Sequence, residues 1–363
     1  MTQKADMNLI NPSTGLYETY HLQTEPDMIY GWARQKSTAY AVGDVVRLSA
    51  LDVSKKLVCV KEGTSGIGEL TLSSTAEGTL ITDGTCVWQV DSFADGNYDA
   101  AHQNGIYRGA DITAYWQSGY MSTNIRAGKF VGMHIGDYIT KTVNLPAITY
   151  TNNSGTQVTQ AAQTFSNVKW LLGAFDQHLH CGDTETTAHH VLIIPASTLQ
   201  RNVPMNDTNT TEGGYLGSKM WTEQMPLWAT GIKAAFGEAH VLSHRELLTN
   251  AVNATGASSA GAGWVGAATG WVWTTVLVNI PNETMVYGGM VFSSSGFDVG
   301  DFPRQLPLYA LKCSHLDDRS WFWLRAVASA SRFCVAATNG GAGCLDASNS
   351  HATGGIRPYF LLR

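Results

Sequence analysis

Histidine, cysteine and aspartate residues gather in one short stretch of the sequence, between positions 176 and 190. They are Asp176, His178, His180, Cys181, Asp183, His189 and His190. Imidazole, thiolate and carboxylate groups close together are the ligands that a zinc site needs. Alternation as on a strand would place His178 and His180 on one face, with Cys181 facing away and residues 182–188 forming a loop. This spacing matches no recognised ligand pattern, so we expect structural hydrogen bonds from Asp176 and the histidines, and no metal site.

Motifs for nucleophilic catalysis or phosphate binding are missing from the sequence. It contains no GxSxG, no HExxH, no GxxxxGK[ST] and no GxGxxG that opens a helix. The sequence therefore predicts a protein that is not an enzyme, with no catalytic residues and no cofactor.

Composition narrows the class of partner. Charged residues make up 14% of the 363 residues, against about 25% in an ordinary soluble protein, and the net charge is −6. A surface rich in Ser, Thr, Asn and Gly is typical of extracellular or virion-borne β-rich proteins. Lys and Arg form no cluster, so we expect no nucleic-acid partner. No apolar stretch approaches the length of a signal peptide or a membrane span, which predicts synthesis in a cytoplasm and no membrane insertion.

Several segments have the periodicity of regular elements. Residues 170–175 and 191–195 are continuous apolar runs, typical of strands buried on both sides. Between 221 and 248 the apolar spacing of three and four predicts helix, and Ser243 with Glu246 forms a capping box for a further helical turn. Alternation typical of strands returns in residues 271–278 and 284–292. Together these segments predict an α+β architecture.

The chain divides into three parts by pattern. Residues 1–30 have Pro breakers and little periodicity, which predicts an attachment and oligomerisation arm. Residues 31–93 carry short alternating apolar runs separated by Gly-rich turns, which predicts a small all-β module. Residues 94–363 form the main domain.

The small module has a recognisable order of motifs. It runs through Trp32, residues 40–46, Cys59, residues 63–66 and residues 83–88. This order resembles the small chitin-binding-type carbohydrate-binding modules. The resemblance implies sugar stacking on Trp32, Tyr40 and Trp88, since sugars pack their C–H faces on aromatic rings. Alternatively, Tyr40 and Trp88 form the core of a module too small to bury much else.

The main domain also matches a known pattern almost end to end. The matching positions are 107–109, 136–139, 182–183, 189–191, Pro195, 205–211, 213–215, 218–220, Glu283, 287–288, 323–325 and 355–360. This set resembles bacteriophage structural proteins with a C-type-lectin-like, formylglycine-generating-enzyme-type fold. The resemblance implies a C-type-lectin-like domain preceded by the small all-β module.

Some members of that family, the variable proteins of diversity-generating retroelements, diversify surface residues of their final segment over a fixed framework. Here the corresponding displayed segment is 320–355. The resemblance implies a framework of Trp323, Leu324, Arg325, Phe333, residues 354–358 and Phe360. The displayed, receptor-binding residues would be Ser320, Trp321, Ser329, Ser331, Arg332, Asn339, Asp346, Ser348, Asn349 and His351. Small, polar and aromatic residues of this kind suit a rigid binding surface.

Formylglycine-forming enzymes of this fold use a reactive cysteine pair near the carboxy terminus. Cys334 and Cys344 lie in that zone, but their separation does not reproduce the enzyme's arrangement. Arg332 is the one basic neighbour that would lower a thiol pKa. The departure argues against catalysis.

The resemblance implies a receptor-binding protein of a phage virion, in a tail fibre or tail tip, that recognises a glycan or protein on the host cell surface. We expect it to attach to other virion proteins through its N-terminal segment and to form a homotrimer, because multivalent display raises avidity. The alternative is a purely structural head-decoration or tail protein without receptor recognition.

Overall fold

The computed structural model describes residues 4–10, 17–23, 33–152, 155–253, 267–293, 304–316 and 319–363, with only the backbone given for the first two ranges. The chain separates into two compact units, Met1–Tyr98 and Asp99–Arg363.

The first unit begins with an antiparallel pair of strands, β1 (Lys4–Ile10) and β2 (Tyr17–Gln23). Both strands lie within the segment 1–30, where the sequence shows little periodicity. Pairing of β1 with β2 therefore supplies regular structure that the pattern of side chains did not predict.

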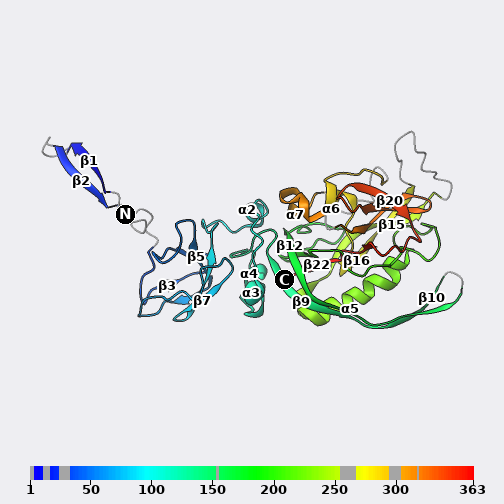
Figure 1. Ribbon diagram of the computed structural model, residues 1–363, viewed down its shortest axis with the longest axis horizontal. Helices are drawn as coiled ribbons and strands as arrows, with labels where there is room; N and C mark the ends of the chain where they lie inside the picture. Colours follow the sequence, from blue (N-terminus) through cyan, green and yellow to red (C-terminus); the bar gives the residue numbers. More distant parts are fainter. Residues whose placement is uncertain are drawn as a thin grey trace. The chain divides into compact units, whose positions relative to one another are not determined.

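The rest of the first unit is a small β structure (Figure 1). Within residues 33–93 every regular element that the structure describes is a strand, as the sequence predicts. One sheet has the order β4-β5-β8-β7, and β3 pairs separately with β6. The strands are β3 (Ala39–Tyr40), β4 (Val45–Val46), β5 (Lys56–Lys61), β6 (Gly63–Thr64), β7 (Leu80–Asp83) and β8 (Cys86–Asp91).

Asp83 connects the motifs of this unit. Its carboxylate accepts two hydrogen bonds from Arg34, both at 2.6 Å, one from the Gly66 backbone at 2.8 Å and one from the Trp88 indole at 3.0 Å. The next residue, Gly84, has a φ of +63°, and a Cβ there would overlap the Thr64 carbonyl oxygen. The Gly-rich turn at 63–66 and the Asp-Gly turn at 83–84 therefore pack directly against each other.

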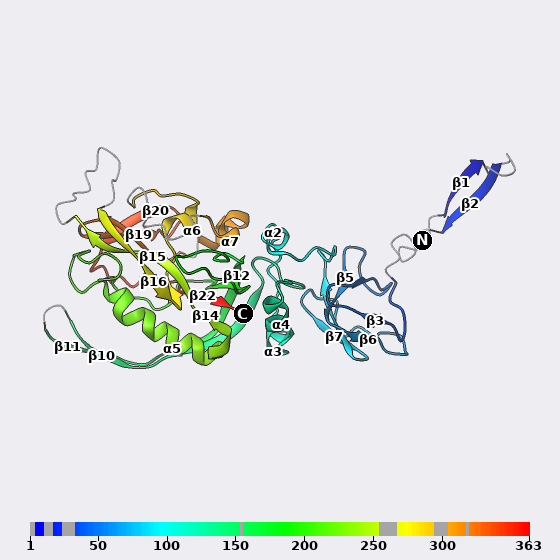
Figure 2. The same ribbon diagram turned by 180° about the vertical axis from the view of Figure 1, so that it is seen from behind.

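The second unit is built on an antiparallel sheet with the order β14-β22-β13-β12-β9, in which β17 also pairs with β22. The C-terminal strand β22 thus lies inside the sheet (Figure 2). The strands are β9 (Tyr138–Leu145), β12 (Gln163–Phe175), β13 (Val191–Pro195), β14 (Val241–Leu242), β17 (Val278–Asn279) and β22 (Tyr359–Leu362). Residues 191–195 are all buried, which confirms the strand predicted there.

Helix α5 (Met225–Phe236) packs against this sheet and follows a π-helical turn, Met220–Gln224. Trp228 and Phe236 of α5 meet Trp170 of β12, with ring centroids 6.4 and 5.8 Å apart. The predicted apolar stripe is therefore confirmed. The helix ends at Phe236 because Gly237 adopts a φ of +93°, so the helix predicted to continue toward residue 248 is wrong.

Strands β9 and β12 continue into a narrow arm, β10 (Ile148–Thr151) paired with β11 (Gln157–Gln160). Figure 1 shows this arm extending beyond α5. Lys219 lies 4.0 Å from the centre of the Tyr150 ring, and the side chains of Gln160 and Gln224 are hydrogen-bonded to each other. These contacts hold the arm beside the π-helical turn.

A second sheet carries the C-terminal segment, with the order β20-β19-β18-β21. Its strands are β18 (Trp321–Ser329), β19 (Arg332–Ala336), β20 (Ala342–Asp346) and β21 (Gly354–Gly355). An antiparallel pair, β15 (His244–Val252) and β16 (Ala268–Val276), contacts β18. Strand β15 contradicts the predicted capping box, since Glu246 lies on a strand with its carboxylate buried.

Short helices complete the second unit. They are α2 (Ala100–Gln103), α3 (Thr113–Gln117), α4 (Tyr120–Arg126), α6 (Glu283–Tyr287), α7 (Pro307–Leu311) and the 3-10 turns Glu238–His240 and Cys313–Leu316. Helix α6 replaces the strand predicted over 284–292, because Asn282 caps it by accepting a hydrogen bond from the Met285 backbone at 2.8 Å. The architecture is mixed α and β and rich in strands.

Candidate functional site

The predicted framework residues of the C-terminal segment are buried. Trp323, Leu324, Phe333 and Phe360 have no exposed surface, and Arg325 and Arg357 are almost fully covered. The Trp323 indole donates to the Val203 carbonyl oxygen at 2.8 Å, and the Arg357 guanidinium lies 4.5 Å from the centre of the Phe322 ring. These residues form a fixed base beneath the C-terminal surface.

Three of the ten residues predicted to be displayed are buried instead: Ser320, Trp321 and Ser329. Trp321 packs edge-to-face on Trp323, with ring centroids 4.9 Å apart, and the Ser320 hydroxyl accepts a hydrogen bond from Arg201 at 2.8 Å. Trp321 and Ser329 are the two ends of β18, which lies between β19 and β21 and is buried along its whole length, and Ser320 directly precedes it. The prediction that these three side chains are displayed is wrong.

The other seven residues, Ser331, Arg332, Asn339, Asp346, Ser348, Asn349 and His351, are exposed or half-buried. Ser331 lies in the turn between β18 and β19, and the others lie on the hairpin β19–β20 and on the loop that follows it. Arg332 and Asp346 face each other across the strands and form an ion pair of 2.9 Å. Asn339 accepts a hydrogen bond from the Gly341 backbone at 3.1 Å, which shapes the turn.

The loop after β20 is anchored at Ala347. The Ala347 backbone N–H donates to the Ser331 carbonyl oxygen at 2.8 Å and to the Asn209 side chain at 3.0 Å. Asn349 and His351 are tied to each other, since the Asn349 side chain accepts from the His351 backbone at 3.1 Å. The polar residues that remain accessible therefore lie on a backbone held in place by hydrogen bonds.

A hollow of about 410 Å³ opens beside this surface, and no sequence motif predicts it. It is lined by Thr210, Glu212, Gly213, Asn250, Ala251, Val252 and Ala330. Ala330 occupies the turn between β18 and β19, and its carbonyl oxygen accepts a hydrogen bond from the Thr211 backbone at 3.0 Å. Hydroxyl, carboxylate and amide groups thus lie next to the hairpin, where they can hydrogen-bond a polar ligand.

The histidine-rich stretch 176–190 does not converge on one point. It is a turn and not a strand, because Asp176 and His180 both have positive φ values, 52° and 58°. His178 is buried whereas His180 is exposed, and Asp183 forms an ion pair with Arg245 at 2.7 Å. The placement of His178 and His180 on one face is therefore wrong.

Asp176 and His190 instead organise this turn by hydrogen bonds. The Asp176 carboxylate accepts from the His190 backbone at 2.9 Å and contacts the His189 ring at 2.8 Å. His190 Nδ1 must donate to the Ala188 carbonyl oxygen at 2.9 Å, and its Nε2 accepts from the His178 backbone at 3.0 Å. Both bonds require a neutral ring, and burial lowers the pKa of His190 to about 3.

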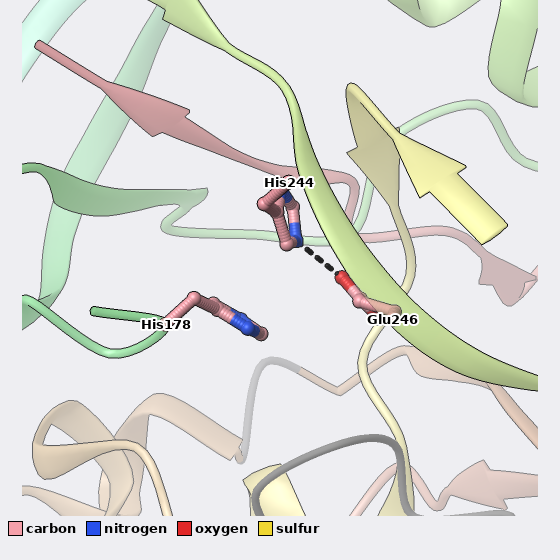
Figure 3. Close-up of side chains that lie close together, drawn as sticks. All are labelled: His178, His244 and Glu246. Atoms are coloured by element: carbon pink, nitrogen blue, oxygen red, sulfur yellow. Dashed lines mark hydrogen bonds and ion pairs between the residues drawn. The ribbon is translucent and has the colours of Figure 1, made fainter. Parts of the chain in front are cut away.

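His178 meets two residues that the sequence stretch did not include, His244 and Glu246 (Figure 3). The two imidazole rings have centroids 4.4 Å apart, and His244 Nε2 lies 2.5 Å from Glu246 Oε1. Figure 3 shows His244 and Glu246 on one strand and His178 on a separate loop. His, His and Glu are zinc ligands in known catalytic sites, so this group is a candidate metal centre by residue type.

The hydrogen bonds of Glu246 argue against that assignment. Oε1 accepts from His244 and from the Tyr359 hydroxyl, and Oε2 accepts from Arg325 at 2.8 Å and from Asn279 at 3.1 Å. These donors occupy the roughly four lone-pair positions of a carboxylate. Burial would raise the pKa of Glu246, but the Arg325 charge and the His244 hydrogen bond outweigh it and hold the pKa well below its ordinary value.

An ionised Glu246 can only accept, so His244 Nε2 carries a proton and cannot ligate a metal through that atom. The group is therefore a buried ion-pair network that joins β15, β18 and β22. Sequence reasoning missed it, although the alternating pair His244 and Glu246 is the signal that places both side chains on one face of a strand.

The candidate sugar-stacking residues of the first unit have different surroundings. Trp88 is fully buried in the core of the module, and its ring meets Tyr40 edge-to-face with centroids 4.8 Å apart. Stacking on Trp88 is therefore a wrong prediction, because both faces of its indole are covered. Tyr40 is half-buried, and its hydroxyl accepts from the Gln35 backbone at 2.7 Å. Trp32 lies outside the described residues.

No helix in the described part of the chain combines the length and the apolar character that a membrane crossing requires. Comparisons with family models, curated proteins and solved structures gave no match to this chain.

Proposed function

We propose that this chain is a bacteriophage virion protein that contacts the host cell surface through a C-type-lectin-like domain formed by residues 94–363. The observation that carries the proposal is the contrast within residues 320–360. A base of buried aromatic and arginine side chains supports a hairpin and loop with accessible small and polar side chains. Rigid backbones with adaptable polar side chains are typical of binding surfaces.

The proposed contact surface consists of Ser331, Arg332, Asn339, Asp346, Ser348, Asn349 and His351, and includes the hollow lined by Glu212 and Asn250. This hollow adds groups suited to a hydroxyl-rich or polar ligand, such as a glycan or a peptide backbone. The two parts of the proposed surface adjoin, because Ala330 of the hollow directly precedes Ser331.

Binding of the fluorescently labelled full chain to a panel of intact bacteria and to a glycan array tests this function. We expect the chain to bind at least one target, and the double variant Asn339→Ala, Asn349→Ala to lose at least about tenfold in affinity. The matched control is Asn144→Ala, which removes an exposed asparagine on β9. No binding above background would favour the purely structural virion role, and equal loss in the control would show a general defect.

Diversification by a retroelement has its own test in the gene. We expect a near-copy of the codons for residues 321–363 beside a reverse-transcriptase gene, differing only opposite adenines. Variable codons that fall on the seven accessible residues and spare the buried Trp321 would support the proposal. Variable codons concentrated on the buried framework would contradict it.

Trimer formation and attachment through residues 1–30 belong to the same proposal, since a trimer combines several weak contacts into one strong attachment. Sedimentation equilibrium of the full chain is expected to give three times the mass of one chain. A monomer at micromolar concentration would contradict the trimer but leave the contact surface untouched.

A further inference from the structure

Cys334 of β19 lies directly opposite Cys344 of β20 in the antiparallel ladder. Backbone hydrogen bonds on either side show whether Cys334 and Cys344 form a hydrogen-bonded or a non-hydrogen-bonded pair. Ala337 N–H donates to the Gly341 carbonyl oxygen at 2.7 Å, and Ala347 N–H donates to the Ser331 carbonyl oxygen at 2.8 Å. Hydrogen-bonded and non-hydrogen-bonded pairs alternate along such a ladder. The cysteine pair is three positions from each of these bonds, so it is a non-hydrogen-bonded pair.

This position suits a covalent bond between the two sulfur atoms. Opposite residues of a non-hydrogen-bonded pair have Cα atoms about 4.5 Å apart and side chains on the same face. Disulfides bridge Cα atoms that are about 4.4–6.8 Å apart. In contrast, Cys59 lies opposite Trp88 and not opposite Cys86, and the register of β5 against β8 shifts just after Cys59. Cys59 and Cys86 are therefore not a directly opposed pair in the ladder of the first unit.

We propose that Cys334 and Cys344 are a modification site, at which a small-molecule disulfide such as oxidised glutathione converts the two thiols into a disulfide across β19 and β20. The bond joins β19 and β20 in the middle of the hairpin that carries Asn339, between the Ala337–Gly341 and Ala347–Ser331 hydrogen bonds. It would form whether or not the hairpin contacts a receptor, because it depends only on the pairing of the two strands.

The exposure of the two thiols sets the order of the reaction. Cys344 is half-buried and Cys334 has no exposed surface. The Cys344 thiolate therefore attacks a sulfur of oxidised glutathione first and releases one glutathione thiolate. Cys334, after losing its proton, then attacks the Cys344 Sγ and releases the second glutathione. Two protein thiols are oxidised, one reagent disulfide is reduced, and the two protons end on the two glutathione molecules.

The local charges affect the rate. Burial raises the pKa of Cys344, while Arg332 lowers it in part. The thiolate is the reacting form, so we expect the oxidation to be faster at pH 8.5 than at pH 7.

The test is oxidation of the full chain with oxidised glutathione, followed by an acid quench, alkylation and peptide mapping by mass spectrometry. We expect a Cys334–Cys344 cross-linked peptide pair, with Cys59 and Cys86 recovered as alkylated thiols. The oxidised chain should melt several degrees higher than the reduced chain, and dithiothreitol should reverse the shift. Cys313→Ser, which removes an exposed thiol, should leave both results unchanged.

Cys344→Ser is the decisive variant, because this half-buried position tolerates the change even if Cys334→Ser does not fold. It should abolish both the cross-link and the melting shift. Recovery of Cys334 as a free thiol after full oxidation would overturn the proposal. So would a stable glutathione adduct on Cys344, or a cross-link of Cys344 to Cys313.

Discussion

The backbone of Gly354 lies so close to the indole ring of Trp321 that a Cβ at position 354 would overlap the ring. The two residues are also paired in the parallel ladder of β18 and β21. The contact explains why the run that begins at Gly354 is framework. It also explains why Trp321, although aromatic and close to the displayed loop, is not available to a ligand.

Gly354→Ala should therefore destabilise the second unit by about 1–3 kcal/mol, the usual cost of forcing extra volume into a packed site. Equilibrium unfolding in urea, followed by tryptophan fluorescence, measures the change. Gly289→Ala is the control, because nothing lies within 4 Å of a Cβ built at that position. Equal stability of the two variants would show that the indole moves aside without cost.

Glu246→Gln should lower the free energy of unfolding by more than its small change in shape suggests. It leaves the Arg325 charge buried without its partner carboxylate, and breaking such a pair from one side costs about 3–5 kcal/mol. Glu238→Gln breaks an exposed ion pair with Lys233 and should cost little. Urea unfolding measures the loss of stability in both variants. A similar loss in both would show that the buried ion pair stabilises the fold no more than the exposed one.

Stability should fall in mild acid because of His190. Its pKa is about 3 in the folded chain and about 6.5 when unfolded, so between these values the unfolded chain binds a proton that the folded chain excludes. Each pH unit below 6.5 then removes up to about 1.4 kcal/mol, and the contribution is present in full above 6.5.

His190→Asn removes this titration, and its amide can still donate to the Ala188 carbonyl oxygen. The slope of unfolding free energy against pH between 4 and 6 should be smaller in this variant than in the wild type. His351→Asn, on the exposed loop, is the matched control and should retain the wild-type slope. Identical slopes in all three proteins would exclude His190 as the acid-sensitive group.

The sequence predicted those elements whose periodicity reflects local burial. Helix α5 packs one apolar stripe against the sheet, and strand β13 is buried on both faces. Their apolar spacing therefore predicts both elements. The helical turn predicted from Ser243 and Glu246 is wrong, because the same spacing also occurs in a strand. The Glu246 carboxylate pairs there with Arg325, which is distant in the sequence. The prediction that Trp321 is displayed is wrong for a similar reason. Its burial depends on pairing with β21, which no local sequence pattern indicates.

Zinc should have no effect on stability, even though His178, His244 and Glu246 lie close together. A bound ion would have to displace the His244 proton and hydrogen bonds from Tyr359, Arg325 or Asn279. Melting temperatures with equimolar zinc and with excess chelator should agree within about one degree. A rise with zinc that disappears in His178→Ala would establish a metal site instead.

Asp83→Asn should unfold the small module while leaving the second unit intact. Its carboxylate is buried and accepts from Arg34, the Gly66 backbone and the Trp88 indole, so the neutral amide leaves the buried Arg34 charge unpaired. The expected loss is about 3 kcal/mol or more, a large share of what a module of this size can supply. Hydrogen exchange followed by mass spectrometry separates the two units, and β5 and β8 should lose protection while β13 and β22 keep theirs. Asp52→Asn, at an exposed turn, should change neither. Loss of protection in both units would mean that they unfold together, and unchanged protection in β5 and β8 would mean that Asp83 does not hold the two glycine turns in place.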